Sequence, residues 1–110
     1  MNKIKIKIKP LSVNKAWQGR RFKTQEYKAY EEELLYILPK IEIPKSKKLQ
    51  VCIEYGFSNK CSDIDNPCKP FLDVLQKKYG FNDSRIYRLI QNKKISEKGG
   101  EYISYRISEL

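Results

Sequence analysis

Hydrophobic and polar residues alternate strictly over residues 3–9, KIKIKIK, which places Ile4, Ile6 and Ile8 on one side of an extended chain and four lysines on the other. Successive side chains of a strand point to opposite faces, so this pattern predicts a half-buried strand. We expect the lysine face to be solvated or to protect a sheet edge, and binding of phosphates by lysines about 7 Å apart is the alternative.

Two segments show the three- and four-residue spacing of amphipathic helices. The first spans about residues 24–38, can be capped by Thr24, and ends before Pro39 and Pro44. Its apolar positions are Tyr27, Tyr30, Leu34, Leu35 and Leu38, and we expect the tyrosines to belong to the core. The second helix is predicted from Phe71, Leu72, Val74, Leu75 and Tyr79, with Gly80 as its left-handed cap.

Three further segments have the pattern of strands. Residues 49–57, LQVCIEYGF, place Leu49, Val51, Ile53, Tyr55 and Phe57 on one face and Cys52 on the other. Residues 86–95 and 101–107 are predicted to be two strands joined by a turn at residues 97–100. Residues 10–23 show no sustained period and are predicted to form a long loop. The order β-α-β-α-β-β over residues 1–110 predicts one α+β domain, a mixed sheet of about four strands with two helices.

The net positive charge of the chain favours a nucleic-acid partner. The 110 residues include 23 Lys and Arg against 13 Asp and Glu, a formal net charge of +10 that attracts polyanions. Solvated surface lysines are the alternative interpretation. No apolar run is long enough to cross a membrane, and residues 1–10 lack the apolar core of a secretory signal, so we expect a cytoplasmic protein without membrane contact.

The residue types that are scarce or absent exclude several kinds of site. The chain has no histidine, which removes Ser-His-Asp and Cys-His catalysis as well as imidazole metal sites. Its three cysteines, Cys52, Cys61 and Cys68, have no CxxC spacing, so we expect reduced, mostly buried thiols. Any catalysis must use carboxylates, lysines or a hard metal ion, and no organic cofactor is expected.

The segment CSDIDNPCKP, residues 61–70, is the strongest candidate for chemistry. In an extended segment Asp63 and Asp65 would project from the same side, and a hard cation, Mg²⁺ or Mn²⁺, would relieve their repulsion. Asn66 and Pro67 are expected to start the second helix as its cap and first residue. Lys69 would then lie near the acidic pair, where its charge and the helix amides favour a phosphate.

Two later aspartates extend this candidate site. Asp73 lies one helical turn after Lys69, and Asp83 follows Gly80 in YGFNDSRI, from where it could return to the acidic pair as a further ligand. Such a set of carboxylates with a lysine would suit metal-assisted phosphodiester hydrolysis. The alternative is that Asp-x-Asp-Asn-Pro is ordinary turn and cap chemistry.

The segment SDIDNPCKPFLDVLQKKYGFNDSRI resembles the signature of the RusA family of Holliday junction resolvases, and PLSVNKAW resembles that family's N-terminal element. The resemblance implies a homodimeric, Mg²⁺-dependent endodeoxyribonuclease that nicks four-way DNA junctions symmetrically in recombination and repair, as in phage or prophage. It places metal-binding aspartates at Asp63, Asp65 and Asp83, a catalytic lysine at Lys69 and the family's helix aspartate at Asp73. The family commonly has two adjacent acids where this chain has Asn82 and Asp83.

Candidate DNA contacts come from basic and aromatic residues in the predicted loop and from one later strand. The candidates are Asn14, Lys15, Trp17, Arg20, Arg21, Lys23, Lys93 and Lys94. Cations beside aromatic rings can pair with phosphates and stack on bases, although Trp17 could instead cap the core. Two other functions remain open: a non-catalytic module that binds junctions, and a metal-dependent nuclease acting on RNA or flaps.

Overall fold

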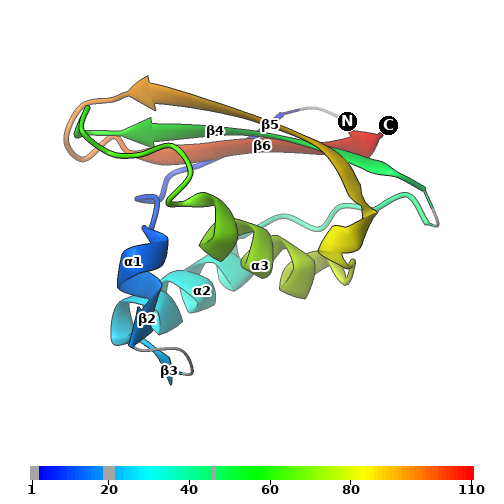
Figure 1. Ribbon diagram of the computed structural model, residues 1–110, viewed down its shortest axis with the longest axis horizontal. Coiled ribbons are helices and arrows are strands. Elements are labelled where there is room, and N and C mark those ends of the chain that lie inside the picture. The colour runs from blue at the N-terminus through cyan, green and yellow to red at the C-terminus, as the bar shows by residue number, and fades with distance from the viewer. Residues whose placement is uncertain (1–2, 19–21, 46) are drawn as a thin grey trace.

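A four-stranded mixed sheet forms one layer of the protein, and its two longer helices form the other (Figure 1). The computed structural model describes residues 3–18, 22–45 and 47–110. The elements follow one another as β1 (Ile4–Ile6), α1 (Val13–Ala16), β2 (Trp17–Gln18), β3 (Phe22–Lys23), α2 (Gln25–Ile37), β4 (Leu49–Phe57), α3 (Cys68–Tyr79), the 3₁₀ turn η1 (Asp83–Arg85), β5 (Ile86–Ile95) and β6 (Tyr102–Glu109). This confirms the predicted α+β architecture and the order of its main elements.

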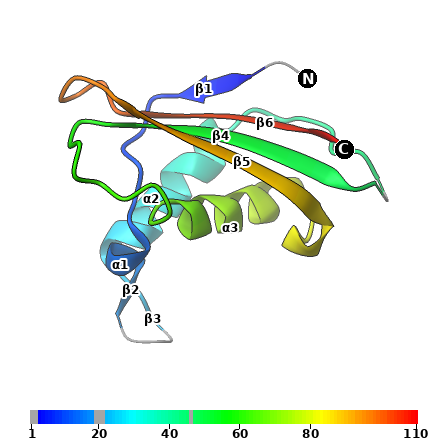
Figure 2. The same ribbon diagram turned by 45° about the horizontal axis from the view of Figure 1, so that its top comes forward.

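The strands of the sheet lie in the order β1-β6-β4-β5 (Figure 2). β4 is antiparallel to β6 and parallel to β5, with Leu49 opposite Ile86 and Phe57 opposite Ile95. The predicted turn at residues 97–100 is present, because Gly100 donates a backbone hydrogen bond to Glu97 over 2.8 Å. However, the strands joined by this turn are not neighbours: β5 and β6 flank β4 on opposite sides. β4, α3 and β5 therefore form a parallel crossover.

The core lies between the sheet and the two long helices, as the apolar periods predict. The alternate residues Leu49, Val51, Ile53, Tyr55 and Phe57 of β4 are all buried. The buried helix residues that pack in the same cluster are Tyr27, Tyr30 and Leu34 of α2 and Phe71, Val74 and Leu75 of α3. Burial of each such side chain contributes about 1.5–3 kcal/mol, which fixes both helices on this face of the sheet.

The N-termini of the two helices differ in how they are capped. The hydroxyl of Thr24 accepts a hydrogen bond from the amide of Tyr27, as expected for α2. The prediction for α3 is wrong by one residue, because Pro67 is the cap and no side chain caps this helix. As a result Pro70 is the third helical residue, where a missing N–H breaks no helical hydrogen bond. The first such bond runs from Phe71 to Pro67.

Two other expectations need correction. Residues 10–23 are not a continuous loop, since they contain the short helix α1 and the strands β2 and β3; elements of two to four residues leave no periodic signal in a sequence. The three thiols are free but not mostly buried, because Cys61 is exposed and Cys52 and Cys68 are half-buried. No helix within the described ranges is long and apolar enough to span a membrane.

Candidate active site

The two strongest candidate carboxylates lie on the acid loop, residues 58–67, which connects β4 to α3. Lys93, near the end of β5, holds this loop: its ammonium donates hydrogen bonds to the carbonyl of Lys60 over 2.9 Å and to that of Ser62. Asn59 closes a turn inside the loop by accepting from the amide of Cys61 over 2.8 Å. Side chains thus hold the loop through its backbone groups, and the loop's carboxylates lie at the surface.

Asp63 and Asp65 are both exposed, but they do not sit on a simple extended segment. Residues 64–67 form turns, in which Cys68 donates its amide to the carbonyl of Asp65 over 3.4 Å. The side chain of Asn66 donates to the carboxylate of Asp63 over 3.5 Å. Alternation therefore does not govern where the two carboxylates point, and only Asp63 lines the neighbouring cleft.

The start of α3 adds a cation and a third carboxylate to this end of the protein. Lys69 lies in the first turn, its side chain 65% exposed, and its ammonium is 3.6 Å from the carboxylate of Asp73. Burial raises the pKa of the Cys68 thiol, and the negative charges of Asp65 and Asp73 raise it further against a hydrogen bond with Tyr55. The charges of Asp65 and Asp73 thus both raise the pKa of the Cys68 thiol, which places both carboxylates near the positive end of the helix dipole.

Asp83 lies at the other end of α3. It begins η1, and its amide donates to the side chain of Gln76, in the last turn of the helix, over 2.9 Å. A helix of 12 residues is about 18 Å long, so Asp83 of the same chain cannot share an ion with Asp65. The physical reason is the parallel crossover: a strand parallel to β4 must begin beside Leu49, where β4 begins, whereas the acid loop follows Phe57.

The carboxylates of one chain therefore do not make a ready metal site. Among residues 3–18, 22–45 and 47–110 there is no group of three or more His, Cys, Asp or Glu placed to hold a metal ion. Asp63 and Asp65 supply the hard oxygen donors that Mg²⁺ prefers, but too few of them in one place. A full ligand set requires donors beyond this arrangement.

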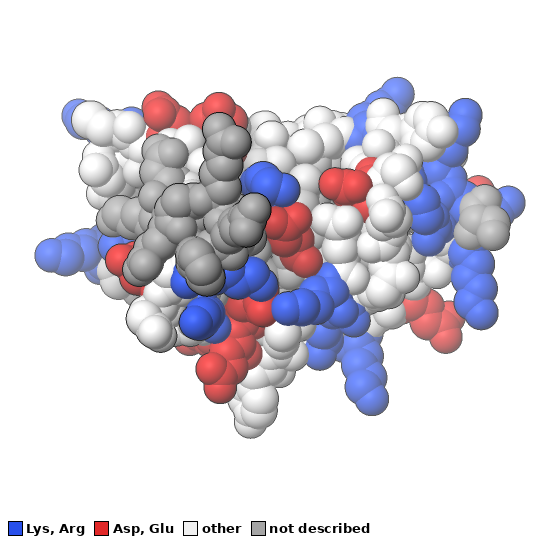
Figure 3. Space-filling model, turned by 60° about the horizontal axis from the view of Figure 1, so that its bottom comes forward, with Lys and Arg blue, Asp and Glu red and all other residues white. Residues whose placement is uncertain are grey.

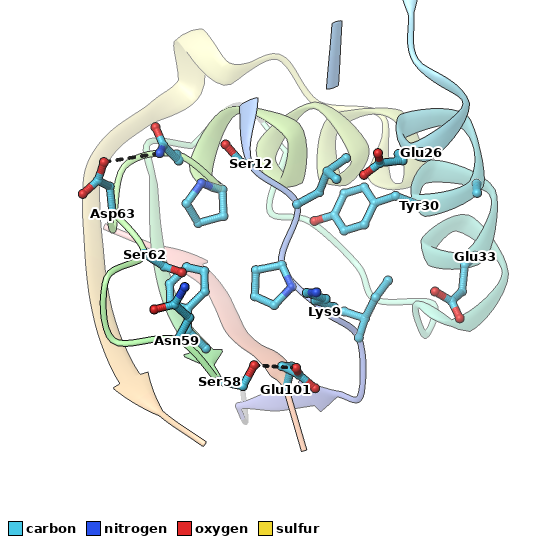
Figure 4. A pocket seen from close by; sticks show the side chains of 17 residues that line it. Lys9, Ser12, Glu26, Tyr30, Glu33, Ser58, Asn59, Ser62, Asp63 and Glu101 are labelled. Atoms are coloured by element: carbon cyan, nitrogen blue, oxygen red, sulfur yellow. Dashed lines mark hydrogen bonds between the residues drawn. The ribbon is translucent and has the colours of Figure 1, made fainter. Parts of the chain in front are cut away.

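A cleft of about 780 Å³ borders Asp63 and brings the two sequence motifs together. Its walls include Pro10 and Ser12 from the first motif and Asn66 from the second, and the amide of Val13 donates to the carbonyl of Asn66 over 2.8 Å. Figure 4 shows Tyr30 projecting from α2 toward the middle of the cleft.

Residues of α2 that line this cleft were not predicted as site residues. Glu26, Tyr30 and Glu33 lie three and four positions apart, so one face of α2 presents all three to the cleft. The hydroxyl of Tyr30 is buried and has no hydrogen-bond partner among the described residues. A signal was available, because the two glutamates flank the tyrosine stripe at helical spacing, but nothing in the sequence placed that stripe beside the acid loop.

Only some of the candidate DNA contacts have side chains that the structure describes. Arg20 and Arg21 lie outside the described residues, as do the side chains of Asn14, Lys15 and Trp17. Lys23 forms an ion pair with Glu31 over 3.0 Å.

The two lysines of β5 face opposite sides of the sheet. Lys93 holds the acid loop on the helix face, whereas Lys94 lies 3.8 Å from Glu54 on the other face. Figure 3 shows many basic side chains on the right-hand side of that view, whereas basic and acidic side chains are mixed over the rest of it. Lys23, Lys93 and Lys94, the candidate DNA contacts whose side chains the structure describes, each contact groups of the protein itself.

Comparison with known proteins agrees with the two motifs. The family model described as endodeoxyribonuclease RusA matches residues 6–105, nearly the whole chain. No curated protein matches the chain. The match spans the N-terminal motif, β4, the acid loop, α3 and β5, and it extends into β6, so it covers far more of the domain than the acidic pair.

Proposed function

The chain belongs to the RusA family of endodeoxyribonucleases, and from that membership we propose that it resolves four-way DNA junctions by paired nicks, with Asp63, Asp65 and Lys69 at the reacting phosphate. The observation that carries the proposal is the end of β4, where two exposed aspartates, an exposed lysine and the positive end of α3 occur together. No histidine is needed for this chemistry.

The reaction is hydrolysis of one phosphodiester bond. A water oxygen bonds to phosphorus, one P–O ester bond breaks, a carboxylate of the acid loop accepts a proton from the water, and the leaving oxygen takes one up. Lys69 would offset negative charge on the phosphate, and the backbone amide of the same residue, in the first turn of α3, would donate to a phosphate oxygen. The ammonium of Lys69 can turn from Asp73 to a phosphate because both side chains reach solvent.

Nucleases of this family depend on a metal ion. We propose Mg²⁺, with Mn²⁺ able to replace it, because the candidate ligands are all carboxylates. Asp63 and Asp65 are the proposed ligands from the acid loop. Asp73 is less suited than these two, since it already pairs with Lys69. Asp83 cannot join them within one chain, which limits what a single subunit can hold.

Substrate contacts are proposed for the basic and aromatic residues before α2, namely Asn14, Lys15, Trp17, Arg20, Arg21 and Lys23. This assignment is supported by position: α1 follows directly from the segment of residues 8–12 that lines the cleft beside Asp63. Lys93 and Lys94 are proposed to act on the loop and the sheet surface rather than directly on the reacting phosphate. A homodimer is proposed because two opposed nicks require two sites.

The direct test is incubation of the purified protein with a labelled synthetic four-way junction and Mg²⁺, beside a linear duplex of the same sequence. We expect paired nicks in strands of equal polarity on the junction and none on the duplex. Tight junction binding without any nicks would establish a binding module instead. Cleavage of flaps or RNA in preference to the junction would assign a different nuclease activity.

A further inference from the structure

The cleft beside Asp63 has the dimensions of a ligand site, and the proposed reaction does not use it. Its volume of about 780 Å³ lies within the range of about 300–1,000 Å³ that is typical of small-molecule pockets. Asp63 belongs both to the lining of this cleft and to the acid loop, where the reacting phosphate is proposed to bind. A DNA strand whose phosphate lies at the acid loop therefore passes the mouth of the cleft.

Tyr30 provides a polar group at the cleft that has no partner among the described residues. The residue is only 6% exposed, and it projects from α2 toward the middle of the cleft (Figure 4). Burial and the nearby Tyr27 raise the pKa of its phenol, so the hydroxyl stays protonated and can both donate and accept. A buried polar group without a hydrogen bond is costly, and a ligand in the cleft can supply that bond.

The charges around the cleft determine which part of a nucleotide can enter it. Among the described residues, its lining carries four carboxylates and one ammonium, on Glu26, Glu33, Asp63, Glu101 and Lys9. This excess of negative charge repels a phosphate, whereas Lys69 and the positive end of α3, outside the cleft, attract one. A nucleotide therefore fits with its phosphate at the start of α3 and its base inside the cleft.

The walls of the cleft suit the flat body of a base. Pro10, Leu11 and Pro67 contribute apolar surface, and Phe57 and Tyr30 contribute aromatic rings. Proteins that extract a base from a duplex hold it in this way, between apolar or aromatic side chains and by hydrogen bonds to its polar edge.

We propose that the cleft binds one unpaired base of the cut strand, beside the reacting phosphate, and that the carboxylates of Glu26 and Glu33 hold the exocyclic amino group of that base. The proposal rests on the proposed function and adds a recognition site to it. Adenine, cytosine and guanine carry such an amino group, and thymine does not. The hydroxyl of Tyr30 makes a further hydrogen bond to the base. Bases beside the branch point are the ones available, because extrusion costs least where pairing or stacking is already interrupted.

Fluorescence of 2-aminopurine tests the proposal without any nicking. Junctions that carry this base at each position beside the branch point are titrated with the protein in the absence of divalent metal. Because 2-aminopurine brightens when it leaves the base stack, the emission should rise several-fold at one position of the cut strand. Junction binding with no rise at any position would overturn the proposal.

Variants of α2 show whether the cleft receives the base. Ala29→Trp should abolish the rise, because Ala29 is exposed and lines the cleft, so that an indole there obstructs the cleft without entering the core. Tyr36→Trp is the matched control on the same helix: this residue is 89% exposed and does not line the cleft, and the rise should remain. A rise that persists in folded, junction-bound Ala29→Trp would refute the cleft as the base site.

Tyr30→Phe removes only the hydroxyl. Because that hydroxyl has no partner among the described residues, its loss should not lower the thermal midpoint of the free protein, but it should reduce the rise in 2-aminopurine emission. A lower midpoint together with an undiminished rise would show that the hydroxyl is structural and does not contact the base.

A cation is the other ligand that an acidic cleft can hold. The methyl resonance of Ala29 is followed by NMR during titration with a single-stranded trinucleotide and, separately, with spermine. We expect the trinucleotide to shift this resonance at the lower concentration. A response to spermine alone would overturn the proposal.

The chemistry of the base is tested with junctions that differ only at the position found by fluorescence. With Mg²⁺, nicking should be about tenfold slower for thymine than for adenine or cytosine, the scale of one hydrogen bond to a charged group. Glu26→Ala/Glu33→Ala should remove this difference, and a difference that persists would refute the role of the two carboxylates. Absence of nicking with the fluorescence results intact would refute only the proposed function.

Discussion

The two ends of the β4-α3-β5 crossover carry similar residues but are built differently. At the exit end, around Phe57, the acid loop exposes Asp63 and Asp65 next to the first turn of α3. At the start end, around Leu49, Asp83 begins η1, and the guanidinium of Arg85 donates hydrogen bonds to the carbonyls of Pro44 and Lys47. One end presents two exposed carboxylates to solvent, and the other is held by hydrogen bonds to the preceding loop.

This difference shows how a parallel crossover places the functional residues before and after its helix at opposite ends of the sheet. A helix that returns the chain to the start of a neighbouring strand separates the residues before it from those after it by its own length. Residues 18 positions apart in one signature, Asp65 and Asp83, are therefore kept apart by the fold that makes the signature. The following changes test the two ends in turn.

The largest effect is expected for Asp65→Asn at the exit end. Loss of a carboxylate at the reacting phosphate should lower the nicking rate by roughly 1,000-fold, the scale of one strong electrostatic contact in a transition state. Because Asp65 is exposed, the thermal midpoint and junction affinity should hardly change. Single-turnover nicking assays measure the rate. Glu32→Gln, an exposed acid on α2, is the control, and full activity of Asp65→Asn would remove the acid loop from the mechanism.

Lys69→Ala should lower the nicking rate by about 100-fold, because the ammonium stabilises charge that develops on the phosphate. Its ion pair with Asp73 is largely exposed and contributes little to stability. The free energy of unfolding in urea should therefore stay within about 0.5 kcal/mol of the wild-type value. The same assay, combined with urea unfolding, separates the two effects. A stability loss that accounts for the loss of rate would show that Lys69 is structural.

Lys93→Met should destabilise the protein by about 1–2 kcal/mol, since two carbonyls of the acid loop lose a charged donor. Amide exchange of residues 58–67 should increase more than that of the rest of the chain. Lys94→Met, on the opposite face, removes only the ion pair of a mostly exposed ammonium with Glu54 and should change stability by less than about 0.5 kcal/mol. Equal effects of the two substitutions would contradict the role of Lys93 as the clamp of the loop.

Gly80→Ala tests the start end, where the helix stops. Gly80 has φ 69°, and a Cβ there would meet no atom within 4 Å, so only backbone strain is added. We expect a loss of about 1 kcal/mol, measured by thermal unfolding, and a smaller loss for Gly80→Asn. Nicking per folded molecule should be unchanged. A larger loss for Asn than for Ala would show that the left-handed conformation is not the cause.

The smallest effect concerns pH. Burial pushes the pKa of Glu31 upward, but hydrogen bonds from Lys77 and Lys23 outweigh it and hold the pKa below its ordinary value of 4.5. A carboxyl whose pKa is lowered on folding stabilises the protein above its ordinary pKa, and that contribution is lost as the pH falls through the lowered value. Wild-type stability should therefore decline more steeply below pH 4.5 than that of Glu31→Gln. Parallel profiles in urea unfolding would contradict this.

The sequence predicts individual elements well because period and burial act locally. The alternation in LQVCIEYGF and the spacing from Tyr27 to Leu38 predicted β4 and α2 almost to the residue. Strand pairing is different, because residues 86–107 contain a good turn whether or not their strands pair with each other. A full helix between two strands was the available signal for a parallel crossover. Missing it led to the prediction that Asp83 returns to the acid loop of its own chain.

The acid loop was selected as the candidate site from the sequence because two carboxylates and a lysine lie close together there. Asp63, Asp65 and Lys69 were identified from charge and spacing, and the family model confirms the family that the wider motif indicated. The cleft beside Asp63 could not be predicted, since it requires α2, the segment of residues 8–12 and the acid loop to meet. Such contacts between distant segments depend on the packing of the whole domain.

The most direct test of the account is a crystal structure of the protein soaked with Mn²⁺, with the metal located by its anomalous scattering. We predict an ion at the exit end, bound by carboxylate oxygens of Asp63 and Asp65 at ligand distances of about 2.1 Å. An ion bound elsewhere on the protein, with Asp63 and Asp65 left without metal, would contradict it.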